Sequence, residues 1–193
     1  DQLLNQNCGL KEPPKESVSR ELIMEMITGF FTLVESLPLN GKEKARDMLA
    51  LLVLLCGAYK CGRVNGIAFS ERKMAEAIGV WKSSARNALQ SLIEKGVIVK
   101  SKNGHCRNAD GYDIDIDFPK WAGLYTNDSI DIDYLLRIVG HDAFRQRAIG
   151  KHGLLLFLYF YFNASSSFSV KTLSNEMRVC VRGIYKWLEP LLE

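Results

Sequence analysis

The 193-residue sequence lacks an apolar run long enough to cross a bilayer. Its longest apolar runs, at residues 49–56 and 154–162, fall short of the roughly 20 residues that a membrane-spanning helix needs. It also lacks a paired cysteine framework, since its five cysteines are an odd number and widely scattered. We therefore expect no membrane partner and a reducing, cytoplasmic compartment. The chain begins without a Met and ends inside an apolar helical pattern, so we expect a piece of a longer protein.

The sequence is also poor in motifs that carry covalent chemistry. None of its three histidines stands in a triad-like or HExxH context, and there is no glycine-rich phosphate loop. Cys56 and Cys61 do not have CxxC spacing and no second pair accompanies them, which argues against zinc. Asp113, Asp115 and Asp117 alternate along an expected strand, so they form a row rather than a cage around a hard cation. We expect no enzymatic activity, no cofactor and no metal.

Apolar residues at helical spacing follow a polar, proline-containing lead-in. They run from Val18 to Val34, and Pro38 ends the pattern. This predicts one amphipathic helix within an N-terminal segment of residues 1–41. Its apolar face is a candidate for self-association through residues 18–36.

A longer series of elements is expected over residues 42–118. In chain order they are a helix from Lys42, an extended piece at 66–69, a helix capped by Ser70, a turn at Gly79, a helix over 82–95, and strands at 97–100 and 112–118. Helix, strand, helix, helix, strand, strand is the order of a winged helix-turn-helix. We therefore expect such a unit over residues 42–120.

The sequence contains an internal repeat. A shift of 99 residues without a gap superimposes the apolar positions of two successive helices: Phe69-Ser70 on Phe168-Ser169, Met74 on Leu173, Ala85 on Ile184, and Leu89 on Leu188. Two copies of one supersecondary unit explain this match. We expect a helical connector over residues 121–149 and a second unit over residues 150–193 with its wing truncated. Pro190 replaces Ser91 of the first copy and should kink or end the helix there.

The fold class expected is therefore mainly α with small β-wings, a tandem winged helix-turn-helix. Within it, the helix over residues 82–95 is the candidate reading element for duplex DNA. Arg pairs with guanine, and Asn or Gln with adenine, in the major groove. An ordinary solvated helix face is the alternative, but such a face normally mixes charges, and residues 79–93 contain no acid.

A basic wing over residues 100–110 is expected to lie along the DNA backbone. The candidate DNA-contacting residues of the first unit are Arg72, Lys73, Lys82, Ser83, Ser84, Arg86, Asn87, Gln90, Lys100, Lys102 and Arg107. Those of the second unit are Lys171, Arg178, Arg182, Tyr185 and Lys186. Residues 71–110 carry a net charge of +4 and residues 111–133 a net charge of −5, so the total of +3 conceals a local separation of charge.

Three segments of the sequence resemble two known families. Ala75–Val80 and Leu92–Ile98, which read A-E-x-I-G-V and L-I-E-K-G-V-I, resemble the winged helix-turn-helix superfamily. Residues 140–151 and the helices after them resemble the winged-helix tail of plasmid and phage replication initiators or primase-helicases, although no primase or helicase motif is present.

The first resemblance implies a module that binds double-stranded DNA, and the second implies a mobile-element replication protein. The missing catalytic motifs predict that the module is non-catalytic, and by elimination we expect it in the cytoplasm with the nucleoid. Other replication proteins would then be further partners. A transcriptional regulator bound to an operator is one alternative. A winged helix that docks a protein is another, and the second unit is the better candidate for it.

Overall fold

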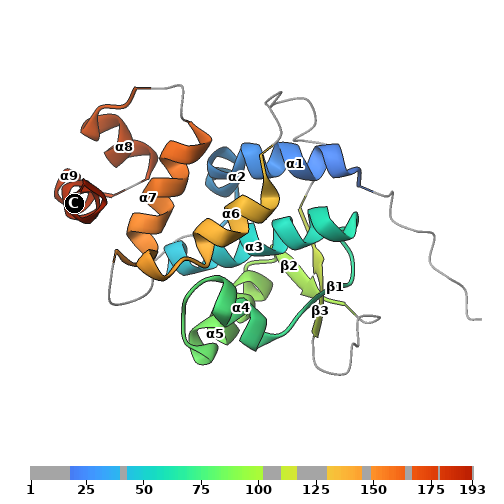
Figure 1. The fold of residues 1–193 in the computed structure, drawn as a ribbon. Coiled ribbons are helices and arrows are strands. Elements are labelled where there is room, and N and C mark those ends of the chain that lie inside the picture. The colour runs from blue at the N-terminus through green and yellow to red at the C-terminus, as the bar shows by residue number, and fades with distance from the viewer. Residues whose placement is uncertain are drawn as a thin grey trace, which may run out of the picture.

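The computed structural model describes residues 18–39, 43–101, 110–116, 130–144, 149–163, 167–177 and 179–192. They form a mainly helical chain with a small antiparallel sheet (Figure 1). In chain order the elements are α1 (Arg20–Thr28), α2 (Phe30–Ser36), α3 (Lys44–Cys61), β1 (Ile67–Phe69), α4 (Glu71–Ala77), α5 (Lys82–Glu94), β2 (Ile98–Lys100), β3 (Asp110–Ile114), α6 (Ile132–Val139), the 3₁₀ helix η2 (Asp142–Phe144), α7 (Gly150–Phe162), α8 (Val170–Glu176) and α9 (Val181–Leu192). The expected mainly helical class with a small sheet is confirmed.

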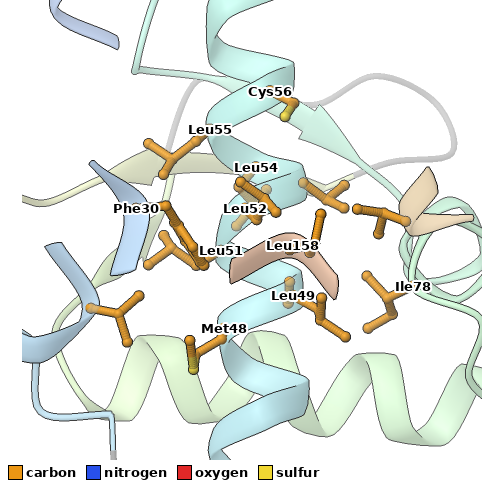
Figure 2. Close-up of a cluster of buried hydrophobic side chains, with 14 of the residues drawn as sticks. Phe30, Met48, Leu49, Leu51, Leu52, Leu54, Leu55, Cys56, Ile78 and Leu158 are labelled. Carbon is orange, nitrogen blue, oxygen red and sulfur yellow. The ribbon is translucent and has the colours of Figure 1, made fainter. Parts of the chain in front are cut away.

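Helix α3 is the centre of the fold. Its apolar residues are buried on all sides, as the nearly continuous run from Met48 to Cys56 predicts. Helices α1, α5, α6 and α7 all pack against it. Figure 2 shows Phe30 from α2, Ile78 from the end of α4 and Leu158 from α7 around α3. The buried apolar residues of all these segments belong to one continuous cluster.

The N-terminal helix differs from its prediction in two ways. Gly29 divides it into α1 and α2. Gly29 is the C-cap residue of α1, and its N–H donates to the carbonyl of Glu25 at 2.8 Å. The apolar residues Ile23, Ile27, Phe30 and Leu33 are fully buried within the chain. Since α1 packs against α3, this apolar face is covered within the chain and gives no support to the expected self-association through residues 18–36.

The strands form one antiparallel sheet in the order β1-β3-β2. Ile67 lies opposite Tyr112, and Ile98 lies opposite Ile114, so the buried side chains share one face. Strand β3 begins and ends earlier than the alternation over residues 112–118 predicted, and one further hydrogen bond, from the N–H of Asp115 to the carbonyl of Val97 at 2.9 Å, follows it. Residues 117 and 118 lie outside the described part of the chain.

Local signals position α4 and α5. Ser70 caps α4 by accepting a hydrogen bond from the N–H of Lys73 at 3.1 Å, as predicted. Gly79, with φ of 63°, makes the turn to α5, and Gly96, with φ of 69°, follows its end. Both glycines occupy the left-handed region that other residues avoid. The turn therefore fixes the direction in which α5 leaves α4.

Helices α8 and α9 begin 99 residues after α4 and α5, the shift that the sequence repeat gave. The correspondence extends to single interactions. Ser169 caps α8 as Ser70 caps α4, and the N–H of Val179 donates to Ser174 as that of Val80 donates to Ala75, both at 3.0 Å. Helix α9 does not end at Pro190 but continues to Leu192.

The segment between the two copies is helical where it is described. Asp131 caps α6 by accepting hydrogen bonds from the N–H groups of Asp133 and Tyr134. An ion pair between Lys60 and Asp133 adds to the packing of α6 on α3. Helix α7 packs against α3 as well, and Lys151 reaches Glu43 at 3.0 Å. The second copy is therefore in direct contact with the first. In the part of the chain that the structure describes, no helix has the length and apolar character needed to cross a membrane.

Candidate nucleic-acid interface

Helix α5 has two distinct faces. The face toward the core consists of Ala85, Ala88, Leu89 and Leu92, which are buried, with Ile93 half-buried beside them. The opposite face consists of exposed side chains that carry hydrogen-bonding groups: Lys82, Ser83, Arg86, Asn87 and Gln90. Small residues on the packed face let α5 lie close to α3 and leave its polar face outward. The outer face therefore brings together five of the predicted site residues.

Ser84 lies elsewhere than predicted. It is half-buried and lines a cleft of about 250 Å³ between the α4–α5 turn and the start of α7. Arg46 and Lys151 also line this cleft, but both form ion pairs with Glu43, at 3.5 Å and 3.0 Å. Ser84 is therefore not part of the outer face of α5.

Trp81 is an exposed residue at the N-terminal end of α5, and the sequence analysis did not select it as a candidate site residue. It occupies the N-cap position and its side chain is 72% exposed. The signal was present: the 99-residue shift pairs it with Cys180, so it falls outside the matched apolar positions. An exposed tryptophan beside Lys82 adds an aromatic surface at the end of the helix where the polar face begins.

Arg86 is held by a carboxylate from the neighbouring helix. Its Nε donates to Oε1 of Glu71 at 2.7 Å and its Nη2 donates to Oε2 at 3.0 Å. Lys82 approaches the same carboxylate at 3.7 Å. The hydrogen bond from Arg86 lowers the pKa of Glu71, and Glu71 in turn raises that of Arg86. The outer face is therefore not free of acid: α4 supplies Glu71, and Glu94, the last residue of α5, is exposed beside Gln90.

Other predicted residues form pairs along their own helix. Arg72 donates to Glu76 at 3.0 Å, and the Gln90 amide donates to Glu94 at 3.0 Å. Exposed pairs of this kind exchange readily with other partners because each contributes only about 0.5 kcal/mol. Lys73 is exposed on α4.

The wing is described only at its base. Strands β2 and β3 pair up to Lys100 and Tyr112, and the N–H of Ser101 donates to the carbonyl of Gly111 at 2.9 Å. Lys100 is exposed and its Nζ lies 3.3 Å from Oδ2 of Asp110. The predicted site residues Lys102 and Arg107 lie outside the described residues.

A buried polar cluster fixes the far end of α5, and the sequence analysis missed it. Asp47 of α3 is fully buried. Its Oδ1 accepts hydrogen bonds from Nε and Nη2 of Arg46, at 3.0 and 2.8 Å. Its Oδ2 accepts from Ser91 at 2.6 Å and from Lys95 at 2.7 Å. Because buried charges need such partners, the cluster ties the last turn of α5 to one place on α3.

The outer face of α9 has a different character. Arg182, Tyr185 and Lys186 are exposed there, and Lys171 is exposed on α8. Val181 and Tyr185 stand 99 residues after Lys82 and Arg86, and they are 44% and 58% exposed. Arg178, the remaining candidate of this unit, lies outside the described residues.

Trp187 of α9 stands 99 residues after Ala88, one of the buried residues of α5. It is half-buried and stacks on His152 of α7, with ring centroids 4.7 Å apart. Burial lowers the pKa of His152, so its neutral form is favoured in this stack.

Among the described residues, Asp113 and Asp115 near β3 and Cys56 of α3 show no arrangement for chemistry. Asp113 accepts a hydrogen bond from the N–H of Gly66 at 2.6 Å, which fixes the turn before β1, and Asp115 is exposed. Burial raises the pKa of the Cys56 thiol to about 12, which makes this thiol a poor nucleophile. Among the described residues, no group of three or more His, Cys, Asp or Glu side chains is placed to hold a metal ion.

Comparisons with protein-family models, with curated proteins and with solved structures found no match to this chain. The assignment of a function to the outer face of α5 therefore depends on its geometry and chemistry alone.

Proposed function

We propose that residues 42–120 form a winged helix that binds double-stranded DNA. In this proposal α5 enters the major groove, and the β2–β3 hairpin lies along the backbone. The single observation that carries it is the outer face of α5. There Lys82, Arg86, Asn87 and Gln90 extend outward from a helix whose other face is buried and whose last turn is held by Asp47.

The order of elements supports the same proposal. Helix α3, strand β1, helices α4 and α5, and strands β2 and β3 follow one another as in a winged helix-turn-helix. With the 99-residue correspondence of α8 and α9, we propose that the chain is a tandem of two such units. The module has no catalytic role in this proposal, and it requires no cofactor.

For the second unit, we propose a docking surface for a protein. Exposed Val181 and Tyr185 stand where the first unit has Lys82 and Arg86, and Glu189 stands where it has Gln90. An outer face with exposed apolar side chains and an acid suits a protein better than a phosphate backbone. Mobile-element replication, with a transcriptional regulator as the alternative, remains a proposal from the sequence resemblance. Mapping the bound sites to an origin or to promoters would decide between them.

The test is a salt series. Labelled duplex DNA is titrated with the native chain and with a Lys82→Ala, Arg86→Ala, Asn87→Ala triple variant, followed by fluorescence anisotropy. We expect the triple variant to lose at least about tenfold in affinity, since one base-reading Arg alone is worth roughly 1–3 kcal/mol. The slope of log affinity against log salt should fall by at least about 0.9, the value of one phosphate contact.

Arg137→Ala on α6 is the control, since it also removes a positive charge from an exposed site. Circular dichroism and thermal unfolding verify that each variant is folded. If the triple variant matches the native chain in both affinity and slope, α5 is not the reading helix.

A further inference from the structure

The ion pair between Glu71 and Arg86 leaves one edge of the guanidinium unused. An arginine has five N–H donors in a planar fork. Glu71 takes the donor on Nε and one donor on Nη2. Both hydrogens of Nη1 and the second hydrogen of Nη2 remain. These donors lie along the outer edge of the fork, and the Arg86 side chain is 65% exposed.

The free edge matches one base in particular. Guanine presents two neighbouring acceptors, O6 and N7, in the major groove, and a bidentate arginine fits them. Adenine presents an acceptor beside a donor, so the same edge of Arg86 would meet a repulsive N–H group there. Because the free edge carries donors alone, it discriminates guanine from adenine, and Glu71 sets the direction in which that edge points.

Glu71 is itself firmly placed. It stands in the first turn of α4, next to the capping residue Ser70, where the helix dipole favours a negative charge. Its side chain is only 24% exposed. A fixed carboxylate restricts a long, flexible arginine before any ligand arrives, which lowers the entropy lost on binding.

We propose that Glu71 is the specificity-determining positioning residue of this interface and aims Arg86 at a guanine in the major groove. This inference rests on the proposed function, and it adds the base that is read and the residue that selects it. Glu71 itself does not touch the DNA.

The first experiment identifies the base. Duplexes with a random central region are selected with the native chain, and the enriched site is sequenced. A guanine is expected in the site, and replacing it with 7-deazaguanine, which lacks the N7 acceptor, should weaken binding by between about 5-fold and 150-fold. The same replacement should not change binding by Arg86→Ala.

The second experiment tests Glu71. Glu71→Gln keeps the shape of the side chain but replaces one acceptor oxygen with an NH2 donor. The pairing of two carboxylate oxygens with Nε and Nη2 of Arg86 is therefore lost. We expect the preference for guanine at that position to fall at least about fivefold, while affinity for a non-specific duplex stays the same or rises. In the Arg86→Ala background, Glu71→Gln should have no further effect on the preference, because the two residues act as one unit.

Glu76→Gln is the matched control, because Glu76 lies on the same helix and pairs with Arg72 instead. It should leave the preference for guanine unchanged.

Three other results overturn the inference. If Glu71→Gln strengthens binding to all duplexes equally and leaves the preference intact, Glu71 only screens charge. If the native chain binds duplex DNA without any preference for guanine, the inference fails while the proposed function stands. If the native chain does not bind duplex DNA at all, both fail.

Discussion

Helices α5 and α9 occupy the same place in the two copies, yet their outer faces differ. At positions 99 residues apart, Lys82 and Arg86 of α5 are replaced by Val181 and Tyr185 of α9. Their inner faces agree more closely: Ala85 and Ile184 are both fully buried, and Trp187, Leu188 and Leu191, which stand 99 residues after buried positions of α5, are half-buried. The difference teaches that two helices at matched positions can share an inward-facing apolar side and still carry different outer faces, which is the basis of the two roles proposed above.

The two helices also differ in how their last turn is fixed. Ser91 of α5 donates a hydrogen bond to the buried Asp47, and Pro190 stands at the matching place in α9. Proline has neither a hydroxyl nor a backbone donor. A firmly fixed reading helix can hold side chains in register with base edges, which a protein-docking surface requires less strictly.

The largest effect is expected from removing the buried anchor of α5. Asp47→Ala would leave Arg46 and Lys95 without their shared buried partner. We expect a loss of about 3–5 kcal/mol in the free energy of unfolding, measured by urea denaturation with circular dichroism. Asp115→Ala, at an exposed site, should change it by less than about 0.5 kcal/mol. A loss below about 1 kcal/mol for Asp47→Ala would show that the cluster does not hold α5.

An exchange at the matched positions tests the difference in the last turn. Pro190→Ser should stabilise the chain by about 1–3 kcal/mol, because the backbone N–H of residue 190 can then donate to the carbonyl of Lys186. The reciprocal Ser91→Pro should destabilise it by at least about 3 kcal/mol, because it also removes the bond to Asp47. Thermal and urea unfolding measure both. If Pro190→Ser is neutral or destabilising, the proline does not weaken α9.

The smallest effect is expected from the basic residues of α9. Arg182→Ala with Lys186→Ala removes two positive charges from α9, as Lys82→Ala with Arg86→Ala does from α5. On duplex DNA we expect the α9 variant to change the salt slope by less than about 0.9, which is less than one phosphate contact. The α5 variant should change it by at least that amount. Equal changes would show that both copies contact DNA, and the proposed division of roles would be wrong.

Much of the local structure could be predicted because short-range rules govern it. Ser70 was readable as a cap and Gly79 as a turn residue, and the apolar match at a shift of 99 residues located α8 and α9. The break at Gly29 was not read, because glycine within a helical pattern is often tolerated and its effect depends on what packs around it. The burial of α1 and α2 on α3 also required the tertiary structure, since an amphipathic face does not name its partner.

The outer face of α5 was predicted in part. Five side chains of α5 point outward as the helical period requires, whereas Ser84 lies in a cleft because α7, distant in sequence, packs nearby. Glu71 and Asp47 escaped notice because their partners lie 15 and 44 residues further along the chain. Neither pairing has a local sequence signal.

The sequence by itself determined the series of elements, the 99-residue correspondence and the polar composition of α5, because each depends on neighbours within one or two helical turns. Only the tertiary structure decided which charges meet. It placed the Glu71 carboxylate on one edge of Arg86 and the Asp47 carboxylate beneath Ser91 and Lys95. Such contacts depend on how helices lie against one another, and the strength of a charge pair depends on the distance and burial that this packing sets.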